Sequence, residues 1–255
     1  MVSDVVALAQ KAGAAIMAVY RAPEVAWTAK QNGSPLCAAD LRSHATLVAG
    51  LAELTPGLAI VSEEGGAGPA RPIGGRFWLL DPLDGTKEFL SRNDEFTVNL
   101  ALVEDGRPVF GVVAAPALQQ IYWGAPALGA FRADATGISA LRAAPPAPGA
   151  PLRVVASKSH LNDATRAYID GLGPCELVQA GSSLKICRIA EGAADLYPRL
   201  GPTCEWDTAA AHAVLAAAGG TLLTLSGQEL RYGKPDVLNP FFIAAAPGCH
   251  LLKEQ

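Results

Sequence analysis

Two aspartates three residues apart, Asp81 and Asp84, directly follow an apolar run in the stretch FWLLDPLDGTKEF. A turn accounts for the proline and the glycine of this stretch, but it does not require a pair of acids. Carboxylates that are brought together repel one another unless a cation lies between them. Oxygen ligands completed by water suit Mg²⁺, and the Leu83 carbonyl can point at the same ion if the Pro-Leu pair bulges outward. The stretch therefore predicts a magnesium site.

Other acids stand at the ends of predicted strands or the starts of predicted helices. Glu63 follows the apolar run AIVS, Asp40 begins one predicted helix, and Asp207 opens an alanine-rich one. In α/β folds, ligands bind beyond the ends of strands. Each position also has an ordinary explanation, such as a solvated strand end for Glu63 or an N-cap for Asp207. Several acids with few basic neighbours nevertheless favour one shared cation.

A second group of residues is suited to phosphate. The segment AGSSLK places Ser182 at a predicted helix start, where free N–H groups and the helix dipole favour an anion. Lys185 adds a charge, and Arg199 offers a planar fork that matches phosphate oxygens. The alternative is that both cations are solvated and that Ser182 only caps the helix. The sequence holds no P-loop, no GxGxxG after a strand and no GxSxG.

The composition indicates a globular protein. The chain has 255 residues, 50% of them apolar, enough for one large domain or two of ordinary size. A net charge of -4 without a basic block argues against a nucleic acid polymer as a partner. The five cysteines lack zinc-ligand spacing, which predicts free thiols in a reduced compartment. No apolar run approaches the roughly 18 residues of a membrane span, so we expect a cytoplasmic protein.

The elements that position these residues follow from periodicity. Helical spacing predicts helices over 3–20, with Ser3 as the cap, and over 39–54. The runs LAIVS and RFWLL predict buried strands that stop at the acids. Two apolar runs separated by Glu-Asp-Gly-Arg predict an antiparallel hairpin that turns at Asp105 and Gly106.

The linker 143–151, rich in proline and alanine, precedes a change of pattern. Beyond it, strands alternate with predicted helices over 161–171, 182–191 and 207–218. This alternation predicts an α/β second half behind an α plus antiparallel-β first half. We therefore expect a domain over 1–150 with most metal ligands and a domain over 151–255 with Asp207 and the substrate contacts. The site is expected at their interface.

The motifs WLLDPLDGTKEF and EWDTAAAHAVLAAAGG together resemble the two signatures of the inositol monophosphatase superfamily. SPLCAAD and IVSEE stand where that family carries its other acidic elements. The resemblance implies a layered αβαβα sandwich. Lys87, Glu88 and Phe89 after Asp-Gly-Thr, with ASKSH, GSSLK and LYPR, resemble the bacterial branch of 3'(2'),5'-bisphosphate nucleotidases. That branch removes the 3'-phosphate from adenosine 3',5'-bisphosphate, giving AMP, and the family is lithium-sensitive.

The resemblance also implies residue roles. Two or three Mg²⁺ ions would be held by Glu63, Asp81, Leu83, Asp84 and Asp207. The catalytic groups that orient and deprotonate water would be Asp40 and Thr86, with Glu63. The substrate would be bound by Gly85, Thr86, His160, Ser182, Lys185, Arg199 and Asp207. The sequence departs from the pattern at Cys37, where relatives commonly carry threonine.

Two other functions fit parts of the pattern. An inositol monophosphatase or a broad sugar-phosphate phosphatase would use the same acids, and a nucleotide-binding regulator would use the scaffold without turnover. For the nucleotidase, the partner is a small bisphosphate nucleotide, bound by a monomer or a homodimer. Peripheral association with the inner membrane is compatible with this reading.

Overall fold

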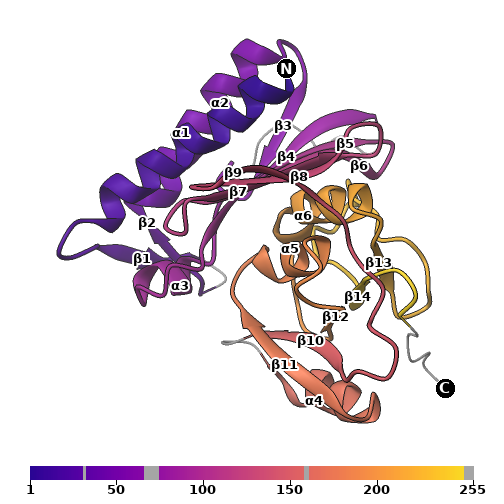
Figure 1. Cartoon of the computed structure of the whole chain (residues 1–255). Helices are drawn as coiled ribbons and strands as arrows, with labels where there is room; N and C mark the ends of the chain where they lie inside the picture. The colour runs from indigo at the N-terminus through magenta and orange to yellow at the C-terminus, as the bar shows by residue number, and fades with distance from the viewer. Residues whose placement is uncertain (31–32, 66–74, 158–160, 250–255) are drawn as a thin grey trace.

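The computed structural model describes residues 1–30, 33–65, 75–157 and 161–249. Its layers run helix, sheet, helix, sheet, helix, as Figure 1 shows. Two long helices cover one face of a seven-stranded sheet, two helices separate it from a five-stranded sheet, and one helix covers the outer face. In chain order these helices are α1 (Val2–Tyr20), α2 (Ala38–Leu54), α4 (Asp163–Gly171), α5 (Leu184–Ala190) and α6 (Glu205–Ala217).

The seven-stranded sheet belongs to the first half of the chain and runs in the order β3-β4-β5-β6-β7-β8-β9. Within it β3 and β4 pair in parallel, and the other neighbours are antiparallel. Its strands are β3 (Ala59–Ser62), β4 (Arg76–Asp84), β5 (Thr97–Glu104), β6 (Arg107–Ala115), β7 (Gln120–Ala125), β8 (Gly129–Asp134) and β9 (Gly137–Leu141). The predicted hairpin is confirmed, because β5 and β6 join at Asp105 and Gly106, both at positive φ.

The five-stranded sheet follows in the order β11-β10-β12-β14-β13. Strands β11, β10 and β12 pair in parallel, whereas β14 and β13 complete the sheet in antiparallel pairing. Its strands are β10 (Leu152–Ser157), β11 (Cys175–Ala180), β12 (Leu196–Arg199), β13 (Thr221–Thr224) and β14 (Phe242–Ala245). A separate pair, β1 (Trp27–Ala29) and β2 (Pro35–Cys37), and the short helix α3 (Thr86–Leu90) stand beside the site.

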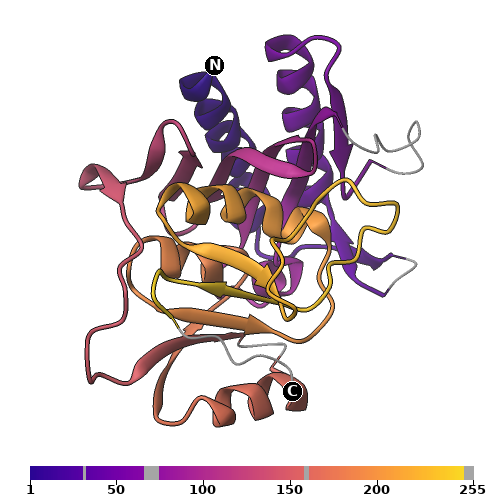
Figure 2. The same ribbon diagram turned by 90° about the vertical axis from the view of Figure 1, so that its right-hand side faces the viewer.

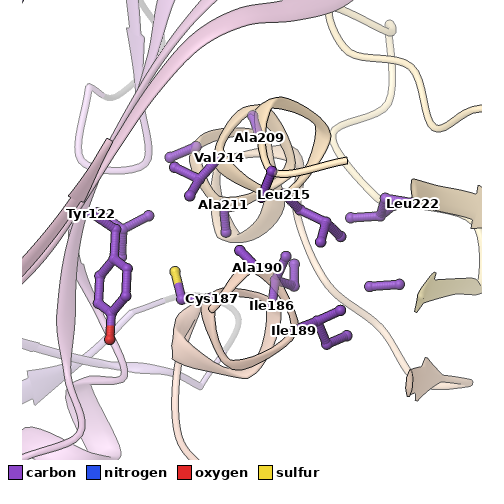
Figure 3. Packing of buried hydrophobic residues seen from close by; sticks show 14 of the residues in the cluster. Tyr122, Ile186, Cys187, Ile189, Ala190, Ala209, Ala211, Val214, Leu215 and Leu222 are labelled. Carbon is purple, nitrogen blue, oxygen red and sulfur yellow. The ribbon is translucent and has the colours of Figure 1, made fainter. Parts of the chain in front are cut away.

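The core explains why β4 is an unbroken apolar run. Successive side chains of a strand point to opposite faces, so Trp78 packs with α1 and α2 while Phe77 packs with α5 and α6. Figure 3 shows the packing between the sheet and helices α5 and α6, where Val214 of α6 and Cys187 of α5 face Tyr122 of β7. Both faces of β4 are therefore buried, and every β4 residue before the acids is buried except the first, Arg76.

Helix α6 approaches the first sheet closely. A Cβ on Gly111 of β6 would lie 2.2 Å from the Ala210 carbonyl oxygen, and one on Gly124 of β7 would lie 3.0 Å from the Ala217 Cβ. The two glycines and the alanines of α6 let the helix sit directly on the strands. In the view turned by 90° (Figure 2), α6 lies between the strands of the first half and those of the second.

Four local predictions need correction. Helix α1 begins at Val2 after Met1, so Ser3 is not its cap. Strand β4 continues through the acids to Asp84 instead of stopping before them, because its ladder with β5 resumes beyond a bulge. Strand β3 is only partly buried, because it is the edge of the sheet. Helix α6 begins at Glu205, so Asp207 is its third residue and not its N-cap.

By length and composition, α1 is the one helix among the described residues that is apolar enough to cross a membrane. The core helix of a globular protein passes the same test, so this finding does not contradict the expectation that no segment spans a membrane. One face of α1 is buried. Its buried side chains include Val5, Leu8 and Ile16, and they pack against the seven-stranded sheet.

The expected domain boundary at residue 150 falls in the connection between β9 and β10. The two halves nevertheless share a core, because Leu79 and Tyr122 of the first half and Val155 and Leu184 of the second belong to one buried cluster. The division into domains over 1–150 and 151–255 therefore stays a prediction.

Candidate functional site

A bulge at the end of β4 aims the two aspartates. In the pairing with β5, Asp81 lies opposite Asn99 and Asp84 opposite Thr97, so β4 carries one extra residue between them. An extra residue bends the strand and redirects its side chains. The Ser43 hydroxyl of α2 donates to the Pro82 carbonyl at 2.7 Å and holds the bulge. The sequence reasoning made a bulge of the Pro-Leu pair the condition for both acids to face one site, and the pairing has a bulge there, with Pro82 and Leu83 buried.

Three carboxylates converge at this point. Asp81, Asp84 and Asp207 each offer an oxygen, and these oxygens lie within 4.8 Å of one another. One oxygen of each acid accepts a backbone N–H, from Leu83 at 3.0 Å, from Ser183 at 2.7 Å and from Cys204 at 2.7 Å, respectively. These hydrogen bonds fix the orientation of the three groups and leave each with a second oxygen for another partner.

The electrostatics favour a cation among these acids. Burial, together with repulsion by Glu63, Asp84 and Asp207, raises the pKa of Asp81 well above its ordinary value. Burial and the neighbouring Asp84 raise the pKa of Asp207 to about 8. Burial raises the pKa of Glu63 as well. A set of oxygen donors that is held together against its own repulsion fits a hard divalent cation such as Mg²⁺.

Glu63 has a partner that sequence reasoning missed. It lies at the same cavity, but its Oε1 accepts a hydrogen bond from Lys30 Nζ at 2.8 Å, and the same ammonium also contacts Glu64. Lys30 directly follows β1, far from the two glutamates in sequence. The sequence feature that could have indicated this ion pair is the pair of adjacent acids, Glu63 and Glu64, with no basic residue close to them in the chain. Glu63 as a metal ligand stays a prediction.

The predicted water-activating residues touch one another. Thr86 Oγ1 lies 3.3 Å from Asp40 Oδ1 and 3.4 Å from the Leu83 carbonyl oxygen. Asp40 is the third residue of α2, and its Oδ2 accepts the backbone N–H of Cys37 at 2.9 Å and the thiol at 3.0 Å. Burial raises the pKa of Cys37 to about 11, so the thiol stays protonated near neutral pH. It therefore supplies the hydrogen bond that a threonine would give.

The serine turn before α5 is engaged with protein groups. The Ser183 N–H donates to the Asp84 carboxylate, and the Ser182 hydroxyl donates to the Asp84 carbonyl oxygen at 2.7 Å. At this helix start, the Ser183 N–H and the Ser182 hydroxyl are therefore bound to Asp84, and anion binding there stays a prediction. Gly85, at φ 87°, lies against this turn, and a Cβ there would be 3.1 Å from Ser182 Oγ.

Two cations, Lys185 and Arg199, also line the cavity. The Lys185 ammonium lies 5.7 Å from the centre of the Tyr197 ring, and burial lowers its pKa although Asp84 acts in the opposite direction. Arg199 donates to the Pro202 carbonyl at 3.0 Å, and its buried Nε has no hydrogen-bond partner among the described residues. His160, the remaining predicted contact, lies outside the described residues.

The cavity that joins these groups has a volume of about 690 Å³, which falls in the range of small-molecule sites, about 300–1,000 Å³. The predicted residues that line it are Glu63, Asp81, Leu83, Asp84, Gly85, Thr86, Ser182, Lys185, Arg199 and Asp207. Asp40 does not line it and acts on it only through Thr86. Acids lie at one end of β4 and cations on α5 and β12, so the cavity is suited to a phosphate bridged by metal ions.

Residues 2–250 match the inositol monophosphatase family, and the chain belongs to that family. An IMPase structure from Thermotoga maritima is 25% identical with a TM-score of 0.78, covering 96% of this chain and 91% of that one. The layered α+β fold that the resemblance implied is confirmed.

Within the family, the chain is similar to proteins of one kind. The 3'(2'),5'-bisphosphate nucleotidase CysQ of Salmonella typhimurium is 46% identical over 248 residues, 95% of this chain and 98% of that protein. The protein of the same name from Escherichia coli strain K12 is 44% identical over the same shares. The crystal structure of CysQ from Bacteroides thetaiotaomicron is 38% identical, with a TM-score of 0.78 and 94% of each chain covered.

Proposed function

We propose that this chain is a 3'(2'),5'-bisphosphate nucleotidase that hydrolyses the 3'-phosphate of adenosine 3',5'-bisphosphate to give AMP and phosphate. The observation that carries the proposal is the cavity itself, in a chain 46% identical to a nucleotidase of that name. Three converging carboxylates line it together with the cations Lys185 and Arg199. Metal dependence is a general property of the family.

The proposed metal ligands are the acids and the carbonyl at the end of β4, together with two acids from elsewhere. Two or three Mg²⁺ ions would be held by Glu63, Asp81, Leu83, Asp84 and Asp207. When bound, the ions neutralise charge on the phosphate and make an attacking water more acidic. A backbone N–H bond fixes one oxygen of each of the three aspartates, and the other oxygen of each would be available to an ion.

The proposed water-activating pair works by a proton relay. Thr86 donates its hydroxyl proton to Asp40, so its oxygen is free to accept a proton from a water. Cys37 donates its N–H and its thiol to the far oxygen of Asp40, which holds the near oxygen against Thr86. A group that accepts a proton at hydrogen-bond distance is what general base catalysis requires.

The proposed substrate contacts separate the two phosphates. The 3'-phosphate lies at the acids, near Gly85, Thr86 and Asp207, and the retained 5'-phosphate lies at Lys185 and Arg199. The unpartnered Nε of Arg199 is a donor that a phosphate oxygen would satisfy, and an arginine fork binds phosphate in two places. Ser182 and His160 complete the proposed set.

The test is phosphate release from adenosine 3',5'-bisphosphate and from inositol 1-phosphate, each with Mg²⁺ and with EDTA. We expect Mg²⁺-dependent release, faster from the nucleotide, and inhibition by lithium. Faster release from inositol 1-phosphate would replace the proposal by an inositol monophosphatase. Tight binding of the nucleotide without any turnover would indicate a regulator on the phosphatase scaffold.

The proposal also covers the partner, the cellular compartment and the oligomeric state. The substrate is a small nucleotide, and the net charge of -4 offers no general attraction for a nucleic acid polymer. We propose a cytoplasmic enzyme that works as a monomer or a homodimer. Sedimentation of the purified protein and fractionation of cells, including the membrane fraction, test both parts.

A further inference from the structure

Strand β5 carries two polar side chains where burial predicts apolar ones. Thr97 is 0% exposed and Asn99 is 1% exposed, in a strand whose other residues before Glu104 are apolar and buried. Two positions apart on a strand, they point to the same face. A buried polar group costs free energy unless it is hydrogen-bonded, so these two residues need partners.

Their partners come from the second half of the chain. Thr97 Oγ1 lies 3.0 Å from Ser182 Oγ and 2.8 Å from Ser183 Oγ. The Ser183 hydroxyl donates to Asn99 Oδ1 at 2.8 Å. This bond leaves the Asn99 amide nitrogen facing Asp84 Oδ2 at 3.4 Å.

The network ends on one oxygen of one proposed metal ligand. Asp84 Oδ2 accepts the Ser183 N–H at 2.7 Å, and Thr97 Oγ1 and Asn99 Nδ2 both lie 3.4 Å from it. Ser182 is held at φ 52°, an unusual conformation for a residue with a side chain, while its hydroxyl reaches the Asp84 carbonyl. This conformation accompanies two hydrogen bonds from the turn to Asp84.

We propose that Thr97 and Asn99 are positioning residues that fix the Asp84 carboxylate for metal binding and tie the serine turn to β5. The inference rests on the proposed function only in taking Asp84 as a metal ligand. Outer partners of a metal ligand orient it, and their loss typically weakens metal binding about 10- to 100-fold. Because the same turn begins α5, the network also holds Lys185 in register with the acids.

The experiment measures Mn²⁺ binding, with the metal alone, by the EPR signal of free Mn²⁺ and by calorimetry. Thr97→Val keeps the shape of the side chain and removes its hydroxyl, and Thr97→Ser restores the hydroxyl. The matched control is Thr55→Val, because Thr55 accepts a hydrogen bond from Trp78 Nε1 at 3.0 Å in the same half of the chain. Ser183→Ala is the second probe, since it removes the hydroxyl bound by Asn99 and keeps the backbone N–H on Asp84.

We expect Thr97→Val and Ser183→Ala to weaken Mn²⁺ binding by about tenfold, Thr97→Ser to bind like the wild type, and Thr55→Val to lose only thermal stability. Folded Thr97→Val and Ser183→Ala proteins with wild-type Mn²⁺ affinity would overturn the inference. A wild-type protein that binds no Mn²⁺ would instead overturn the proposed metal site. If Thr97→Val does not fold, the Ser183→Ala measurement decides.

Discussion

Removing divalent cations and raising the pH from 7 to 8 is expected to destabilise this protein. In the folded chain, burial and the neighbouring Asp84 raise the pKa of Asp207 from 3.8 to about 8. Between these two values the folded protein holds a proton that the unfolded chain has released. The free energy of unfolding therefore falls as the pH rises through this window, and the loss is complete once the folded group ionises.

The expected loss of stability can be estimated from the release of one proton. A difference of one bound proton changes the free energy of unfolding by about 1.4 kcal/mol per pH unit. This is an upper limit for Asp207, because its side chain is partly exposed at the cavity and solvent screens its charge. At about 2–4 °C per kcal/mol, Tm should fall by up to about 3–6 °C for that carboxyl. Asp81, whose pKa is also raised, acts in the same direction.

Two other buried groups, His212 and Cys187, contribute little to the stability change between pH 7 and 8. Burial lowers the pKa of His212 to about 4, so its neutral ring favours the folded state more as the pH rises, but mostly below pH 7. Burial raises the pKa of the Cys187 thiol, which therefore destabilises the folded state only near and above the ordinary thiol pKa. Between pH 7 and 8 the carboxylates dominate the change.

The assay is thermal unfolding followed by circular dichroism at pH 7 and pH 8, in EDTA and in saturating Mg²⁺. Mg²⁺ should raise Tm and flatten its pH dependence, because a bound cation favours the ionised acids in the folded state. Asp207→Asn removes the titrating group, so its Tm in EDTA should change less between the two pH values. An equal Tm for the wild type at both pH values in EDTA, or an equally steep fall in Asp207→Asn, would refute the electrostatic argument.

Three further predictions concern single side chains. Asp84→Asn should lower Mg²⁺-dependent phosphate release by about a hundredfold or more, because it removes a charged ligand. Its circular dichroism spectrum should stay native. Near-normal turnover at saturating Mg²⁺ would exclude Asp84 from the metal site. Lys185→Ala should raise KM for adenosine 3',5'-bisphosphate about tenfold, through loss of a charge-assisted hydrogen bond, and should matter less for adenosine 3'-monophosphate. Equal losses on both substrates would contradict its role on the second phosphate. Cys37→Ala should lower the free energy of unfolding in urea by about 1 kcal/mol, as loss of a helix cap does, and Cys37→Thr should leave it unchanged. Equal free energies of unfolding for the two variants would show that the thiol hydrogen bond does not stabilise the protein.

Local chemistry could be predicted from the sequence because it depends on neighbours in the chain. The hairpin at Asp105 and Gly106 follows from residue types within a few positions, whereas the bulge between Asp81 and Asp84 was only a condition of the sequence reasoning. The apolar run of β4 indicated a strand buried on both faces for the same reason. The strands β7, β8 and β9 were not predicted. Strand β8 is only partly buried and β9 is mostly exposed, which gives a weak pattern, although β7 is mostly buried.

The sequence by itself determined which acids could serve a metal and how Asp81 and Asp84 relate to each other. Only the tertiary structure decided that Asp207 joins them, because α6 must settle on the strands at Gly111 and Gly124 to bring its first turn to the bulge. It also decided that the serine turn before α5 binds Asp84 through the Ser183 N–H and the Ser182 hydroxyl. Spacing along the chain fixes groups a few residues apart, whereas groups a hundred residues apart are placed by the packing of the elements that carry them.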